Sequence, residues 1–127
     1  MEALRDRGAR ERRLDPERVH VFALRDYAAE MKQEAEYLDN GHTGVLLMRT
    51  ESLRMLLEVV AEGARLDEHV ISGPATLQVL EGALDVEVEG ESFHVSEGEI
   101  VVLPHDETRK LTARRASTFL LSLTLGR

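Results

Sequence analysis

A strict alternation of apolar and acidic residues limits most strongly how this chain can fold. Leu84, Val86 and Val88 alternate with Asp85, Glu87 and Glu89, and Gly90 follows directly. Because the side chains of a β-strand point to the two faces of a sheet in turn, this pattern predicts a strand with one buried and one solvated face. The glycine tolerates the positive φ of a hairpin turn. The three acids are therefore expected to form a solvated face, not a catalytic group.

Other segments between residues 43 and 127 repeat this period of two. They are residues 45–48, 53–60, 75–79, 93–95, 100–103 and 117–124. Residues 45–48 are apolar throughout, so this strand should be covered on both sides. In residues 53–60 we expect Leu53, Met55, Leu57 and Val59 to face the core, with Arg54, Leu56, Glu58 and Val60 on the other face. Several short strands joined by glycine turns predict an all-β sandwich or barrel over residues 43–127.

The first 42 residues are organised differently. Residues 1–13 mix five arginines with acids and contain little that could be buried, so we expect a mobile tail. Residues 14–42 should pack on the barrel as a strand and a helix. Alternating apolar residues at 19–23 predict the strand, and residues 26–35 have the composition and charge spacing of a helix. Asn40 and Gly41 should end that helix.

Length, charge and residue types exclude several classes of protein. With 127 residues the chain forms one domain, and without cysteine it has neither a disulfide nor a thiolate site. The net charge is −8, and no Lys or Arg lies between Arg65 and Arg109, so this surface repels nucleic acid. A basic arm within residues 1–13 is the alternative, but acids interrupt it. No apolar run could span a membrane or serve as a signal peptide, which predicts a cytoplasmic protein without a membrane partner.

From about Ser52 to Leu123 the chain resembles the small single-domain cupins. The landmarks that carry the resemblance are Gly63, His69, Leu80, Gly82, Gly90, Gly98 and Pro104. Gly73-Pro74 followed by residues 77–82 is similar to a subgroup of short bacterial cupins. The resemblance implies an all-β jelly-roll barrel, the double-stranded β-helix, with a short N-terminal extension. It also implies a pocket at one mouth of the barrel and, commonly, a homodimer.

The same resemblance bears on a metal cofactor. Cupins hold one metal with three histidines and a glutamate, and the corresponding positions here are His69, Ile71, Ala75 and Arg109. Isoleucine and alanine have no donor atom, and a cationic arginine repels a metal. We therefore expect no metal. The alternative is a divalent transition metal held by His69 together with Asp67, Glu68 or Glu107.

The residues expected to line the pocket are His69, Ile71, Ala75, Leu77, Arg109 and Leu111. Two interpretations of Arg109 remain open: a surface ion pair with Asp106 or Glu107, or a contact to a carboxylate or phosphate at the pocket mouth. His69 also has two interpretations, a structural histidine hydrogen-bonded to the backbone or a nearby acid, and a ligand contact. No nucleophile with an acid–base partner is evident, so no catalytic residue is predicted.

The sequence thus predicts a metal-poor cupin that binds a small, anionic ligand or acts as a regulatory or interaction module. One alternative is a metal-dependent dioxygenase or isomerase with an unusual ligand set around His69. Another is a purely structural dimer. For the homodimer we expect an interface on a second apolar face, formed by Leu46, Met48, Leu56, Val60 and Leu80. The N-terminal strand and helix could cover that face instead.

Overall fold

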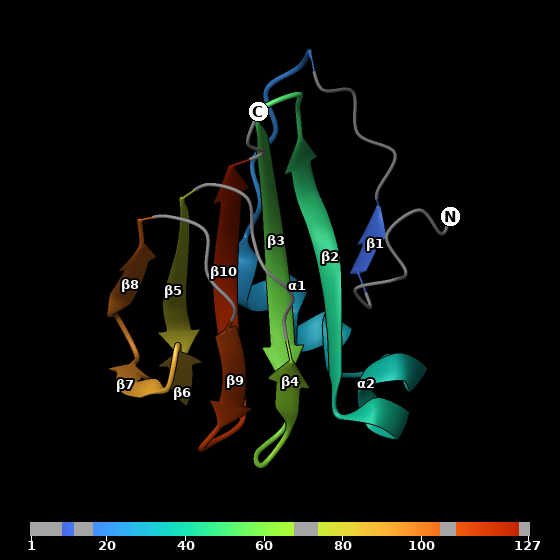
Figure 1. Cartoon of the computed structure of the whole chain (residues 1–127). Helices are drawn as coiled ribbons and strands as arrows, with labels where there is room; N and C mark the ends of the chain where they lie inside the picture. Colours follow the sequence, from blue (N-terminus) through green and yellow to red (C-terminus); the bar gives the residue numbers. More distant parts are fainter. Residues whose placement is uncertain (1–8, 12–16, 68–73, 105–108, 125–127) are drawn as a thin grey trace.

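Two facing β-sheets form the body of the protein (Figure 1), in a computed structural model that describes residues 9–11, 17–67, 74–104 and 109–124. The six-stranded sheet has the order β1 (Ala9–Glu11), β2 (His42–Arg49), β3 (Leu53–Val60), β10 (Ser117–Thr124), β5 (Ala75–Glu81) and β8 (Ile100–Leu103). The four-stranded sheet has the order β4 (Arg65–Asp67), β9 (Arg109–Ala113), β6 (Ala83–Val88) and β7 (Glu91–Ser96). The predicted all-β jelly roll is confirmed.

Between the sheets lies the main apolar core, which we call the interior cluster. Its buried members are Leu46, Leu56, Val60, Ala75, Leu77, Val79, Leu84, Val86, Val88, Val95, Leu103, Leu111, Ala113, Phe119, Leu121 and Leu123. The alternation of β6 is confirmed, because Leu84, Val86 and Val88 are buried while Glu87 is exposed. Burial of one face of each sheet in this way supplies most of the stability of a two-layer β fold.

The faces predicted for β3 are wrong. Leu56 and Val60 point into the interior cluster. Leu57 and Val59 lie on the opposite side of the sheet, in a second apolar cluster. The alternation itself was correct, but both faces of β3 are apolar, and a period of two does not say which face points inward. With Leu46, Leu56 and Val60 buried in the barrel, the surface predicted for a dimer does not exist in that form.

The N-terminal helices cover the outer face of β2 and β3. Helix α1 (Leu24–Met31) buries Ala28 and Met31 completely against this face, and α2 (Ala35–Asn40) follows. Helices and strands together enclose the second apolar cluster (Figure 1). Gly41 ends α2 with φ of 84°, a left-handed conformation that favours glycine. Among the described residues no helix is long and apolar enough to cross a membrane.

Two features of the N-terminal region differ from the sequence prediction. The strand expected at residues 19–23 is absent, and Val19 and Val21 are 93% and 92% exposed. The helix expected at 26–35 is two short helices. Within the predicted tail, Ala9–Glu11 forms β1 and pairs in parallel with β2, from Ala9 opposite Gly44 to Glu11 opposite Leu46. The other residues of 1–16 lie outside the described part of the chain.

Candidate functional site

Strand register defines one end of the barrel interior, which we call the barrel mouth. Ala75 begins β5 and lies opposite Leu103 of β8 and Leu123 of β10. Arg109 begins β9 and lies opposite Val88, the last residue of β6. Val88 and Leu103 line the same depression, which shows that the two sheets meet at this end. Residues 68–73 and 105–108, which connect the strands here, lie outside the described residues.

Arg109 points into the barrel. Only 1% of this residue is exposed, and it shares the inward face of β9 with Leu111 and Ala113. The sequence left two interpretations of Arg109 open, and its buried position is inconsistent with the surface ion pair. Its Nε and Nη2 atoms are buried and make no hydrogen bond, although the residue does interact with another part of the chain. A guanidinium in such surroundings needs compensating negative charge or acceptors.

Glu58 is a second buried charge that sequence reasoning missed. It lies on β3 between Leu56 and Val60 on the inward face and is 2% exposed. Its carboxylate extends over Gly44 of β2, where a Cβ would lie 3.2 Å from Cδ and 3.4 Å from Oε1 of the glutamate. In the sequence, the signal for this burial is an acidic residue inside a strand whose two faces are both apolar. Such an acid cannot be placed in solvent on either side.

Arg54 lies further along the same inward face of β3. Its register partner on β10 is Leu123, a member of the interior cluster, and its Nε atom is buried. Like Glu58, it interacts with other parts of the chain. Arg54, Glu58 and Arg109 thus give the inward faces of β3 and β9 two positive charges and one negative charge.

The remaining predicted pocket residues divide into two groups. Ala75, Leu77 and Leu111 are buried in the interior cluster, where they supply apolar surface. His69 and Ile71 lie outside the described residues, as do Glu68 and Glu107 from the alternative metal site.

A metal ligand set does not assemble from the described part of the chain. There, no group of three or more His, Asp or Glu side chains could hold a metal ion. The resemblance implies that Ala75 and Arg109 stand at two positions that cupins give to metal ligands, and neither side chain can donate an electron pair to a metal. Arg109, with N–H donors only, suits an anion and not a cation, whereas the nearby depression that Val88 and Leu103 line also contains Glu89 and Glu91.

Comparisons with known proteins find similar architectures only among solved structures. No protein-family model matches the chain, and no curated protein does either. A solved conserved protein of unknown function from Streptococcus pyogenes has a TM-score of 0.68 and 21% identity, covering 87% of this chain and 91% of that one.

Two further solved structures have a similar fold, and the first of them is named as a cupin. A cupin superfamily protein from Desulfitobacterium hafniense has a TM-score of 0.64 at 13% identity, over 68% of this chain and 79% of that one. KdgF from a Halomonas species has a TM-score of 0.62 at 23% identity, over 71% and 84%. At these identities the likeness concerns the fold alone. The sheet order, the packed interior and these similarities show that the chain has the cupin fold.

Proposed function

We propose that the barrel mouth binds a small carboxylate and that Arg109 supplies the main contact to its charge. The observation that carries this proposal is the burial of Arg109, the largest of the fully buried side chains that the structure describes. A guanidinium presents a planar pair of N–H donors that matches the two oxygens of a carboxylate. In a low-dielectric interior such a pair is stronger than it is in water.

The charged residues on the inward face of β3 support a monocarboxylate over a phosphate. Glu58 brings a negative charge to the inward face of β3, and it would repel the second charge of a phosphate monoester. Arg54 adds a second positive charge on the same strand. Ala75, Leu77 and Leu111 offer only hydrocarbon, which suits an apolar substituent on the carboxylate. We assign binding and no chemical step to this site.

The test is thermal unfolding in the presence of small monocarboxylates such as benzoate and pyruvate, at constant ionic strength. A ligand that binds only the folded state raises the Tm. We expect a rise for the wild type and none for Arg109→Met, because Met keeps the apolar stem and removes the charge. Removing one charge from a buried set can cost about 3–5 kcal/mol, so circular dichroism is used first to establish that Arg109→Met is folded.

The matched control is Arg65→Met, which removes an exposed arginine from β4 and should keep the response. If the wild type and Arg109→Met respond equally to every carboxylate, Arg109 is not the ligand contact. If inorganic phosphate replaces the carboxylates as the stabilising ligand and Arg109→Met abolishes its effect, the site exists but the ligand class is wrong.

A further inference from the structure

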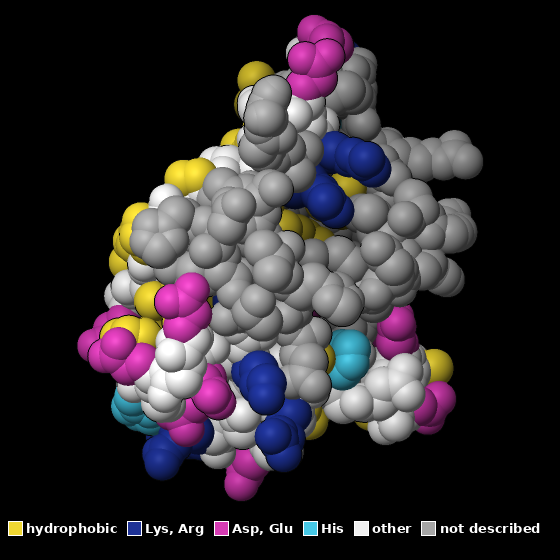
Figure 2. All heavy atoms as spheres, in the orientation of Figure 1, with side chains coloured by type: hydrophobic (Ala, Val, Ile, Leu, Met, Phe, Trp, Pro, Cys, Tyr) yellow, Lys and Arg dark blue, Asp and Glu magenta, His cyan; other side chains and the backbone are white. Residues whose placement is uncertain are grey.

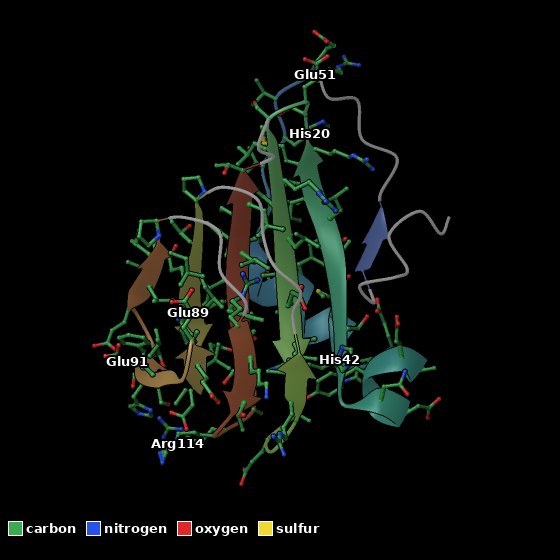
Figure 3. The ribbon with its side chains drawn as sticks, viewed as in Figure 1. His20, His42, Glu51, Glu89, Glu91 and Arg114 are labelled. Atoms are coloured by element: carbon green, nitrogen blue, oxygen red, sulfur yellow. The ribbon has the colours of Figure 1, made fainter. Side chains whose placement is uncertain are left out.

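A depression of about 520 Å³ lies at the opposite end of β6 from the barrel mouth, where β6, β7 and the turn after β9 meet. Among the residues that the structure describes, Ala83, His94, Arg114 and Arg115 line it, and the three titratable ones are basic. Dark-blue basic side chains gather toward this lower end of the molecule (Figure 2), where Figure 3 labels Arg114. Such a lining is notable on a chain with a net charge of −8.

Asp85 holds two of these basic side chains in place. Its Oδ1 lies 2.9 Å from Nδ1 of His94, its register partner on β7, and its Oδ2 accepts a hydrogen bond of 3.1 Å from Nε of Arg114. Asp85 itself does not line the depression. The carboxylate therefore orients the imidazole and the guanidinium. These two interactions do not use Nε2 of His94 or the two Nη atoms of Arg114, which can therefore face a ligand.

The turn that carries the arginines is fixed by the backbone of Ala83. The amides of Arg114 and Arg115 both donate to the Ala83 carbonyl, at 2.9 and 3.4 Å. The Ser117 hydroxyl accepts from the Ala83 amide at 3.0 Å and donates to the Arg115 carbonyl at 2.7 Å. Gly82 makes this approach possible, because a Cβ there would collide with the Ser117 hydroxyl. A turn tied down in this way loses little further freedom when a ligand binds.

We infer that this depression binds the phosphate group of a small molecule. Two guanidinium groups surround the hollow together with an imidazole whose Nδ1 faces Asp85 and whose Nε2 can face a ligand. This donor set matches the several acceptor oxygens of a tetrahedral dianion. A carboxylate has only two oxygens and would leave part of this donor set unused. The site lies outside the barrel and shares no residue with the barrel mouth, so it is independent of the function proposed above.

The experiment is calorimetric titration of the full chain with inorganic phosphate and with glycerol phosphate, at an ionic strength held constant with chloride. We expect saturable binding. The double variant Arg114→Gln/Arg115→Gln should weaken it by about tenfold or more, since charge-assisted hydrogen bonds are lost. Tighter binding of glycerol phosphate would identify an organic phosphate as the ligand, and tighter binding of phosphate would identify the free ion.

The matched control is Arg25→Gln/Lys32→Gln, which removes the same amount of charge from α1 and its C-cap residue, where both side chains pair with Glu81. Binding should stay within about twofold of wild type, because screening by salt removes most long-range effects of charge. Arg109→Met should also retain phosphate binding. Arg114 and Arg115 are exposed, so the test variant should fold, and Arg115→Gln alone gives a second version of it.

Three results would overturn the inference. The first is equal affinity of the wild type and the double variant. The second is a heat signal that never saturates with either compound. The third is loss of phosphate binding in Arg109→Met together with its retention in Arg114→Gln/Arg115→Gln, which would place the phosphate in the barrel mouth instead.

Discussion

Gly44 and Glu58 face each other across β2 and β3, and the glutamate side chain occupies the space that a side chain at Gly44 would fill. The carboxylate group is thereby held inside the barrel at 2% exposure. A glycine in a strand costs stability through its backbone entropy. Here it makes room for a buried acid inside the barrel.

The first prediction concerns this pair. Gly44→Ala should destabilise the protein by about 1–3 kcal/mol, because the new Cβ forces the Glu58 side chain to move in a packed interior. In the Glu58→Ala background the same substitution should cost less than half as much. Urea unfolding of the four members of this cycle measures the coupling. Additive costs would show that the glycine is required for another reason.

The second prediction concerns Leu56, which is fully buried in the interior cluster. Leu56→Ala should lower the free energy of unfolding by about 2–5 kcal/mol through the lost contacts and the remaining cavity. Leu56→Glu should prevent folding, as judged by circular dichroism. Met48→Ala, at a position that is 41% exposed, serves as the control and should cost less than about 1 kcal/mol. A folded Leu56→Glu protein would contradict the inward face assigned to β3.

The third prediction is a homodimer, with its interface moved from the face that the sequence suggested. β8 is an edge strand of the six-stranded sheet and exposes Ile100 and Val102 by 53% and 60%, with Phe93 of β7 at 39%. An edge strand with exposed apolar side chains can pair with a second copy. We expect light scattering to give twice the mass of one chain.

Val102→Lys should split this dimer, because a lysine on an edge strand opposes pairing. Val19→Lys, a change of an even more exposed valine away from the strand, should not. A wild-type mass equal to one chain, or a dimer that survives Val102→Lys, would count against this interface.

The fourth prediction concerns metal content. Because Ala75 and Arg109 stand at two metal-ligand positions of the cupin pattern, protein purified without a histidine tag should carry no stoichiometric transition metal. Elemental analysis decides this. About one metal per chain, lost on His69→Ala, would show instead that His69 is part of an unusual ligand set.

A gain of function complements that measurement. Changing Ile71 and Arg109 to His together with Ala75→Glu should create metal affinity, because the variant restores the donor types of the cupin pattern. A folded triple variant that binds no metal would show that these positions do not converge as the resemblance implies.

The sequence predicted those parts of the fold in which one face of a strand differs clearly from the other. Leu84, Val86 and Val88 are an example, since the acids between them leave only one way to place the strand. β3 was misplaced because both of its faces are apolar, so only contact with α1 could separate the inward Leu56 from the outward Leu57.

The candidate site was predicted less completely. The inward position of Arg109 depends on the pairing of β9 with β6, which alternation within β9 does not reveal. Glu58 was overlooked because its burial depends on a glycine in another strand, 14 residues earlier in the chain. The strand expected around Val19 and Val21 does not form, because an alternating pattern does not by itself provide a neighbouring strand for pairing.

The helix cover on β2 and β3 has a practical consequence for anyone who trims this protein. Residues 43–127 contain every strand of the barrel except β1 and the first residue of β2. A fragment that began there would nevertheless expose the apolar outer surface of Val45, Leu47, Leu57 and Val59, now sealed by Ala28 and Met31. Such a fragment should aggregate, since large exposed apolar patches promote association. The shortest soluble expression product should therefore begin upstream of Leu24, well before the first residue of the predicted barrel.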